Sequence, residues 1–133
     1  MDRIDLRIEV PAVTAADLIL PAASEGSADV AARVAAAHDF RRARYAAAGL
    51  PHIRTNAEAP ASVLEEIAQR DPQGTKLLRD AAETMRLSAR SYHRVLRLAR
   101  TLADVYGADK IGKLHLAEAP SYRALAEDLR RAA

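Results

Sequence analysis

The chain is organised around residues 87–104, Leu87-Ser88-Ala89-Arg90-Ser91-Tyr92-His93-Arg94-Val95-Leu96-Arg97-Leu98-Ala99-Arg100-Thr101-Leu102-Ala103-Asp104. Ser88 is a suitable N-cap, because its hydroxyl can accept a hydrogen bond from an amide left unpaired at a helix start. Gly107 can adopt the left-handed conformation that commonly ends a helix. The stretch therefore predicts a helix that begins near Ser88 and stops before Gly107.

Apolar residues recur along this predicted helix at steps of three and four, so one side of it should be buried. They are Tyr92, Val95, Leu96, Ala99, Leu102, Ala103 and Tyr106. Arg90, Arg94 and Arg97 follow another side. Arg90 falls in the first turn, where the helix dipole prefers an anion, and is unfavourable there by about 0.3 kcal/mol or more unless an anion binds beside it.

The composition favours a single helical domain. The chain has 133 residues, half of them hydrophobic, with one Phe and no Trp, and helices packed through small side chains suit it better than a β-sandwich. It has no cysteine, so disulfides, thiolate metal sites and cysteine nucleophiles are excluded. The net charge of +2 is too small to indicate nucleic-acid binding by itself. No signal peptide or membrane span is visible, and we expect a cytoplasmic protein.

The N-terminal residues predict one convincing β-strand. Apolar and charged residues alternate from Ile4 to Val10, and Pro11 ends the pattern. A single strand leaves its backbone hydrogen bonds without partners. We therefore expect residues 1–10 to be the last strand of a sheet that lies upstream and is absent from this chain. Residues 1–26 would comprise that strand and a connector, and residues 27–133 would form a helical lid domain.

Five or six helices are expected after the connector, from their caps and apolar periodicity. The first is capped by Ser27 and runs to about Ala48, and the second runs from Pro60 to Ile67 or Ala68. The third opens with a capping Asp71 and Pro72, the fourth begins at Ser88 and the fifth near Gly112. Pro120 interrupts the fifth, and Ser121 caps a last helix. The first helix should bury Val30, Val34, Ala37 and Tyr45 and expose Arg33, Arg41, Arg42 and Arg44. The predicted fold class is all-α, a five- or six-helix bundle preceded by one orphan β-strand.

Motifs of several enzyme and metal-site classes are missing. The five glycines are scattered and none belongs to a GxxxxGK[ST] phosphate loop, so the chain is not a complete nucleotide-hydrolysing domain. The four histidines lack zinc-site spacing, and no metal site is predicted. Ser88 and Ser91 near His93 do not lie on a hydrolase elbow. The pair Glu65-Glu66 is interpreted as surface charge.

Arg90 and Arg3 remain as candidate functional residues. From the first turn of its helix, the Arg90 guanidinium can reach a bound phosphate and bind two of its oxygens. Arg3 stands at the start of the predicted strand, from which its side chain can project beyond its own domain. An ordinary solvated arginine is the alternative interpretation at both positions.

The segments around these two arginines resemble the AAA+ ATPases related to the magnesium-chelatase I subunit, especially the ComM/YifB type. The similar segments are Asp2-Arg3-Ile4-Asp5-Leu6 with Glu9-Val10-Pro11, Leu87 to Leu96, Ala99 to Asp104, His115-Leu116-Ala117-Glu118-Ala119, and Ser121-Tyr122-Arg123. The resemblance covers essentially the whole chain and corresponds to the C-terminal part of such proteins. The Walker motifs that lie upstream in the family are not present here.

The resemblance implies a role for each arginine. Ser88-Ala89-Arg90 resembles the sensor 2 motif of a helical lid, so Arg90 would contact the γ-phosphate of ATP. Asp2-Arg3-Ile4-Asp5 resembles the arginine-finger segment that reaches the nucleotide of a neighbouring subunit. Both arginines would then be catalytic in the full-length ATPase, with Arg90 also binding the nucleotide.

The resemblance also implies the surroundings in which the chain would act. The full-length protein would use ATP and Mg²⁺, whereas the chain alone would bind neither and would not be an enzyme. Its partners would be an upstream AAA+ core and the neighbouring subunits of a homo-hexamer. The ComM type is associated with DNA branch migration during recombination of transforming DNA, which makes DNA a possible partner.

Two other interpretations stay open from the sequence. The Arg90, Arg94 and Arg97 side of the helix, together with the arginines of residues 41–44, would suit a helical nucleic-acid-binding module. The affinity of such a module for DNA would fall steeply with salt. The second interpretation is a helical oligomerisation domain without an ATPase role.

Overall fold

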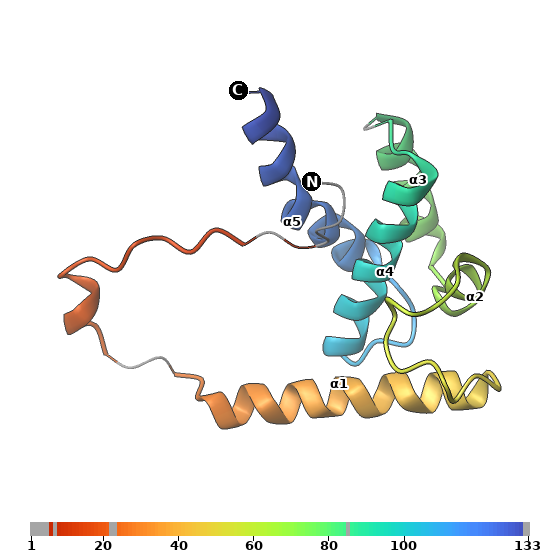
Figure 1. The fold of residues 1–133 in the computed structure, drawn as a ribbon, viewed down its shortest axis with the longest axis horizontal. Helices are drawn as coiled ribbons and strands as arrows, with labels where there is room; N and C mark the ends of the chain where they lie inside the picture. Colours follow the sequence, from red (N-terminus) through yellow and green to blue (C-terminus); the bar gives the residue numbers. More distant parts are fainter. Residues whose placement is uncertain (1–5, 7, 22–23, 85, 132–133) are drawn as a thin grey trace.

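A computed structural model of the chain describes residues 6, 8–21, 24–84 and 86–131, with side chains described up to residue 122. This part contains one short 3-10 helix and five α-helices and no strand, so the predicted all-α class is confirmed (Figure 1). The elements are η1 (Asp17–Ile19), α1 (Ser27–Ala47), α2 (Ala61–Ile67), α3 (Pro72–Thr84), α4 (Ala89–Val105) and α5 (Lys113–Arg131).

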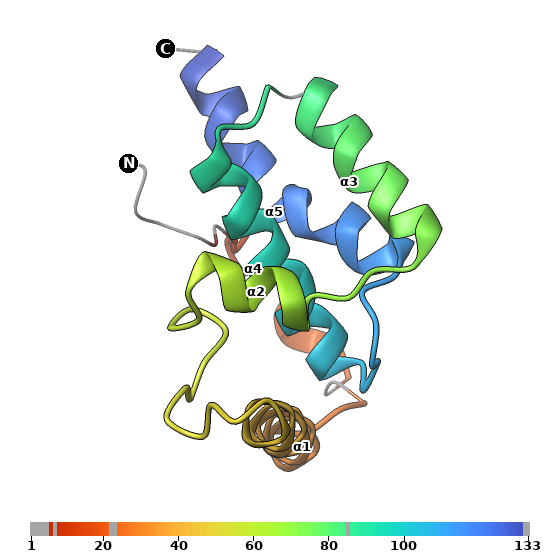
Figure 2. The same ribbon diagram turned by 90° about the vertical axis from the view of Figure 1, so that its right-hand side faces the viewer.

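The helix predicted from residues 87–104 is α4, and it lies in the middle of the bundle against α1, α2 and α5 (Figure 2). Its predicted stripe supplies four buried core residues, Val95, Leu96, Ala99 and Ala103. The prediction is wrong for Tyr106, which is 64% exposed because it is the C-cap residue beyond the last packed turn. Gly107 ends the helix as predicted, with a φ of 67°.

The apolar side of α4 forms most of the main core, together with residues from the helices around it. The buried members are Leu64, Ala68, Leu78, Val95, Leu96, Ala99, Ala103, Ile111, Leu116 and Ala119. Every α-helix except α1 contributes to this cluster. A smaller cluster of Tyr45, Ile53 and Ala59 attaches the end of α1 and the loop that follows it.

Only the second half of α1 packs against the bundle, and Figure 1 shows its first half extending beyond the other helices. Ala37 and Tyr45 are buried as predicted. Val30 and Val34 are 38% and 43% exposed, so the predicted buried stripe is wrong in the first half. The apolar stripe runs along the whole of α1 in the sequence, but the bundle surface on which α1 packs is shorter than the helix.

The N-termini of α1 and α3 are both stabilised by an aspartate side chain that accepts a hydrogen bond from a backbone amide. The N-cap of α1 is Gly26 rather than the predicted Ser27, and the Gly26 N–H donates to Asp29 Oδ2 at 3.0 Å. Asp29, the third residue of the helix, thereby supplies the N3 half of a capping box, and its charge suits the positive end of the helix dipole. At α3 the capping prediction is confirmed, because the Gly74 N–H donates to the Asp71 carboxylate.

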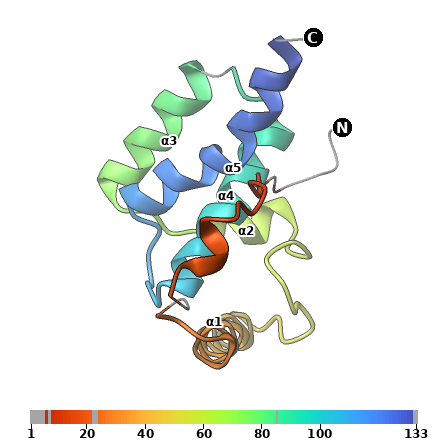
Figure 3. The ribbon, with the colours of Figure 1, turned by 90° about the vertical axis from the view of Figure 1, so that its left-hand side faces the viewer.

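The predicted interruption at Pro120 is wrong, because α5 is one helix from Lys113 to Arg131. Pro120 has no N–H to donate, and prolines inside helices produce kinks. Figures 2 and 3 show that α5 changes direction along its length. Ser121 does not cap a separate helix, since its Oγ donates to the Glu118 carbonyl at 2.6 Å. Ala119 is fully buried in the core, which holds the helix across the proline.

Residues 8–21 form an arm outside the bundle (Figure 1). Leu6 and residues 8–10 adopt no strand, because a strand needs a hydrogen-bonded partner and no described segment pairs with them. The rest of the predicted strand lies outside the described residues. Residues 8–21 are all exposed, and η1 is their one helical turn. The division between residues 1–26 and 27–133 stays a prediction. No described helix combines the length and the apolar character needed to cross a membrane.

Candidate functional site

The turn between α3 and α4 places Arg90 at the surface. The Leu87 N–H donates to the Ala82 carbonyl at 3.0 Å, which closes the end of α3. Ser88 Oγ then accepts from the Ser91 N–H at 3.2 Å, so the predicted N-cap of α4 is confirmed. Arg90 follows as the second residue of the helix, in its first turn.

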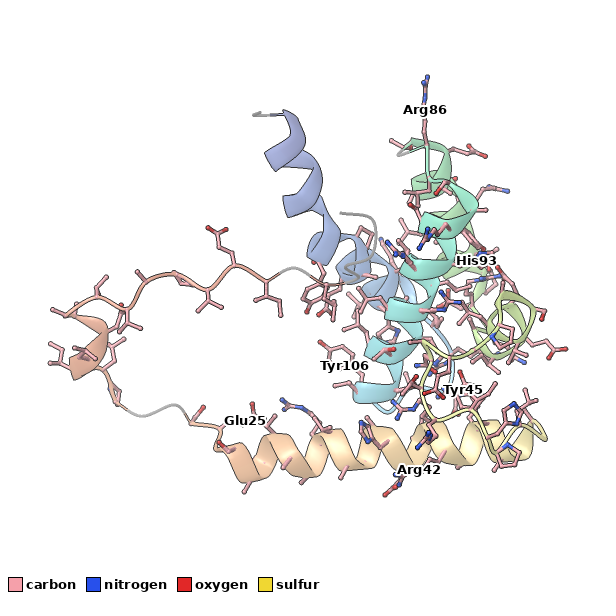
Figure 4. The ribbon with its side chains drawn as sticks, viewed as in Figure 1. Glu25, Arg42, Tyr45, Arg86, His93 and Tyr106 are labelled. Atoms are coloured by element: carbon pink, nitrogen blue, oxygen red, sulfur yellow. The ribbon has the colours of Figure 1, made fainter. Side chains whose placement is uncertain are left out.

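Arg90 is exposed, and within the described part of the chain it makes no hydrogen bond or ion pair. The first turn of α4 contains no acidic residue that could compensate its charge. Arg86 precedes the same turn with a φ of 46° and points away from the bundle (Figure 4). Two exposed arginines therefore flank a helix N-terminus, where unpaired amides and the helix dipole already favour an anion.

Several of the other arginines that were predicted to form a basic surface are partly buried, and two of them make contacts inside the bundle. Arg97 is half-buried and its Nη2 donates to the Ala59 carbonyl at 3.0 Å. Arg44 forms an ion pair with Asp104, so the prediction of a fully solvated basic face on α1 is wrong at this position. Arg94 is half-buried on α4. The arginines therefore do not form one continuous exposed face.

A polar cluster holds the second turn of α4, directly after Arg90. Arg70 donates to Glu65 Oε2 at 3.1 and 3.2 Å and to the Tyr92 hydroxyl at 3.4 Å. His93 Nε2 lies 3.6 Å from Glu65 Oε1. Burial raises the pKa of Tyr92, so its hydroxyl stays protonated. The cluster fixes α4 against the end of α2, and it corrects the interpretation of Glu65 as simple surface charge.

A second and more deeply buried network surrounds Asp104 near the other end of α4. Its carboxylate accepts from Asn56 Nδ2 at 2.9 Å, from Arg100 Nε at 3.0 Å and from Arg44 Nη1 at 3.2 Å. The Tyr45 hydroxyl donates to Asn56 Oδ1 at 3.0 Å, and burial raises the pKa of this tyrosine. Burial lowers the pKa of Arg100, and the Asp104 charge opposes that shift. The network joins α1, the loop after it and α4.

Sequence reasoning missed this network. One signal was available, since Arg100 and Asp104 are four residues apart and must share a face of the helix. Nothing in the sequence indicated that Asn56, in an irregular loop, would reach the same carboxylate.

Of the two predicted site residues, the structure describes only Arg90. Arg3 lies outside the described residues, so the two are not brought together. Among the residues that the structure describes, no three metal-binding side chains of the His, Cys, Asp or Glu type form a group.

The chain matches a known protein family over most of its length. Residues 24–123 match the family described as magnesium chelatase, subunit ChlI C-terminal, and this range includes Arg90 but not Arg3. It covers all of α1 to α4 and the first half of α5.

Several bacterial proteins are similar along nearly the whole chain. YifB of Salmonella typhimurium, an uncharacterized protein, is 34% identical over 128 residues, which are 94% of this chain and 24% of YifB. The competence protein ComM of Haemophilus influenzae is 33% identical over 139 residues, covering 98% of this chain and 25% of ComM. The chain thus spans about a quarter of the length of these relatives. It belongs to the magnesium chelatase ChlI C-terminal family and is a relative of the ComM and YifB proteins.

Proposed function

We propose that this chain is the helical lid of a ComM-type AAA+ ATPase and that Arg90 is its sensor 2 arginine. The observation that carries the proposal is the exposed position of Arg90 in the first turn of α4, without a partner among the described residues. A guanidinium there can donate two hydrogen bonds to phosphate oxygens, and the helix N-terminus adds favourable dipoles. Membership of the magnesium chelatase ChlI C-terminal family supports the lid part of this proposal.

The chain would supply one part of a composite site. ATP and Mg²⁺ would be held mainly by an upstream AAA+ core, since no phosphate-binding loop occurs in the sequence. Arg90 would contact the γ-phosphate, and Arg3 would reach the nucleotide of a neighbouring subunit in a homo-hexamer. Positive groups in these positions stabilise the charge that spreads over the transferred phosphoryl oxygens.

The cluster around Arg70 would keep Arg90 on a rigid support. The contacts of Glu65 and Tyr92 with Arg70 fix α4 at a position two residues after Arg90. A change in the bound nucleotide would then move the lid as a body and alter how subunits meet. We propose that this motor is cytoplasmic and acts on DNA in branch migration.

The test is the variant Arg90→Ala in the full-length ATPase that the proposal requires. We expect ATP turnover to fall by about 10³-fold or more, because a charge-stabilising contact to the phosphoryl group is lost. The matched control is Arg42→Ala, which removes an exposed arginine of α1 whose partner Asp39 is also exposed. Circular dichroism should show unchanged helix content in both variants.

Wild-type turnover in the Arg90→Ala variant would overturn the sensor assignment. The 133-residue chain alone should not hydrolyse ATP, and activity there would contradict the composite site. The nucleic-acid-binding alternative predicts salt-sensitive DNA binding by the isolated chain. It has less support from the structure, because Arg44 and Arg97 make internal contacts.

A further inference from the structure

A second surface lies where α4 turns into α5. A recess of about 560 Å³ opens there, and we call it the α4–α5 recess; its lining is Tyr106, Leu114, His115, Ala117 and Glu118. Leu114 is 80% exposed and Tyr106 is 64% exposed, although both are large and mainly apolar. Figure 4 shows Tyr106 at the end of α4, and its ring lies beside the His115 ring of α5. The recess shares none of its lining residues with the surface around Arg90.

The recess contains a carboxylate that has no cationic partner among the side chains that the structure describes. Glu118 is half-buried and accepts hydrogen bonds from the Tyr122 hydroxyl at 2.9 Å and the Tyr106 hydroxyl at 3.4 Å. Among the described residues it forms no ion pair. Lys113, the one lysine of α5, lines a different hollow against α3, and the side chain of Arg123 lies outside the described part of the chain. A charge in a mainly apolar setting gains most from a partner that brings the opposite charge.

His115 does not supply that opposite charge. Its Nδ1 accepts from the Gly112 N–H at 3.0 Å, which leaves the proton of the neutral ring on Nε2. Burial lowers the pKa of His115, so the ring is neutral at pH 7. The His115 and Tyr106 rings lie 5.6 Å apart at 32°, and together they form an aromatic wall beside Glu118.

We propose that the α4–α5 recess binds an arginine side chain of a partner protein. A guanidinium can pair with the Glu118 carboxylate through two parallel hydrogen bonds and can stack on an aromatic ring at the same time. A lysine ammonium is compact, strongly hydrated and unable to make both contacts in this way. An apolar residue beside the arginine would cover Leu114. The site is independent of the role proposed for Arg90.

The test uses the 133-residue chain and short peptides as probes. The first probe is acetyl-Ala-Leu-Arg-Leu-Ala-amide, and its matched control replaces arginine by citrulline, which keeps the shape but has no charge. Titration into the isotope-labelled chain is followed by NMR. We expect saturable shifts at Tyr106, Leu114 and Glu118, with a Kd of about 1 mM as for other small contacts, and binding of the citrulline peptide about tenfold weaker.

Two variants make the result specific to the recess. Glu118→Gln should weaken binding of the arginine peptide about tenfold. Glu66→Gln, at an exposed glutamate of α2, should leave it unchanged. Should Glu118→Gln disturb the fold, Tyr106→Leu provides a second route, because it keeps the carboxylate but removes the aromatic surface and should weaken the arginine peptide several-fold.

Three outcomes would overturn the proposal. They are equal affinity for the arginine and citrulline peptides, unchanged binding in a folded Glu118→Gln variant, and shifts that lie away from the α4–α5 corner. Equal binding of a peptide with lysine in place of arginine would also overturn it, because that result would reduce the interaction to simple charge attraction.

Discussion

Asp104 is the residue on which the buried charges of the bundle depend. One carboxylate with 2% of its side chain exposed balances two guanidinium groups, from Arg44 and from the fully buried Arg100. The Asn56 amide adds a further donor. Removal of the carboxylate charge would leave a buried guanidinium without compensation, which is far more costly than the loss of an exposed pair.

We therefore expect Asp104→Asn to lower the free energy of unfolding by about 3 kcal/mol. Urea denaturation followed by circular dichroism measures the change. The control is Asp39→Asn, which breaks an exposed pair with Arg42 at 3.2 Å and should change the free energy by about 0.5 kcal/mol or less. Equal effects of the two substitutions would show that the buried network does not stabilise the fold.

At the level of elements, the approach of α3 to the start of α5 depends on Gly74. A Cβ built at this glycine would lie 3.0 Å from the Ile111 carbonyl oxygen and 3.1 Å from Leu116 Cδ1. The Ile111 backbone cannot easily move away, because its N–H donates to the Gln69 carbonyl at 2.9 Å and its side chain is fully buried. Because Gly74 has no side chain, α3 can approach Ile111 and Leu116 closely.

Gly74→Ala is a sharp test of this contact, because helix propensity and packing predict opposite signs. Alanine stabilises a helix by about 1 kcal/mol relative to glycine, but overpacking destabilises the fold by about 1–3 kcal/mol. We expect a net destabilisation of about 1 kcal/mol in urea denaturation. Gln73→Ala changes an exposed position of the same turn and should be nearly neutral. A stabilised Gly74→Ala variant would mean that the contact is loose.

Sequence reasoning predicted the elements where the signal is local. The Ser88 cap, the Gly107 stop and the Asp71 cap are interactions within four residues of a helix end, and all three are confirmed. The prediction that Pro120 ends a helix is wrong, because whether a helix continues through a proline depends on tertiary packing, here the burial of Ala119 in the core.

The candidate site follows the same pattern. The position of Arg90 in the first turn of α4 was predictable from its cap. The cluster around Arg70 and the network around Asp104 were not, since their partners are brought together by packing of helices and loops that are distant in the sequence. The exposure of Val30 and Val34 could not be predicted either, because periodicity identifies an apolar face of a helix but does not show whether another helix covers it.

Across the whole molecule, α1 has two halves of different character. Residues 27–36 are exposed throughout, whereas Ala37 and Tyr45 are buried and the hydroxyl of Tyr45 is bonded to Asn56. Short helices without tertiary contacts are marginal in water, so the first half should depend on the anchored second half for its stability. The molecule therefore combines a firmly packed bundle with a helix that is attached at one end.

Amide hydrogen exchange should reveal this gradient along α1. We expect residues 31–36 to exchange at least about tenfold faster than residues 38–47, because local opening needs no loss of buried contacts in the first half. Tyr45→Phe, which removes only the hydroxyl bonded to Asn56, should accelerate exchange in residues 38–47 and leave residues 31–36 unchanged. Uniform protection along α1 at low protein concentration would contradict the one-ended attachment.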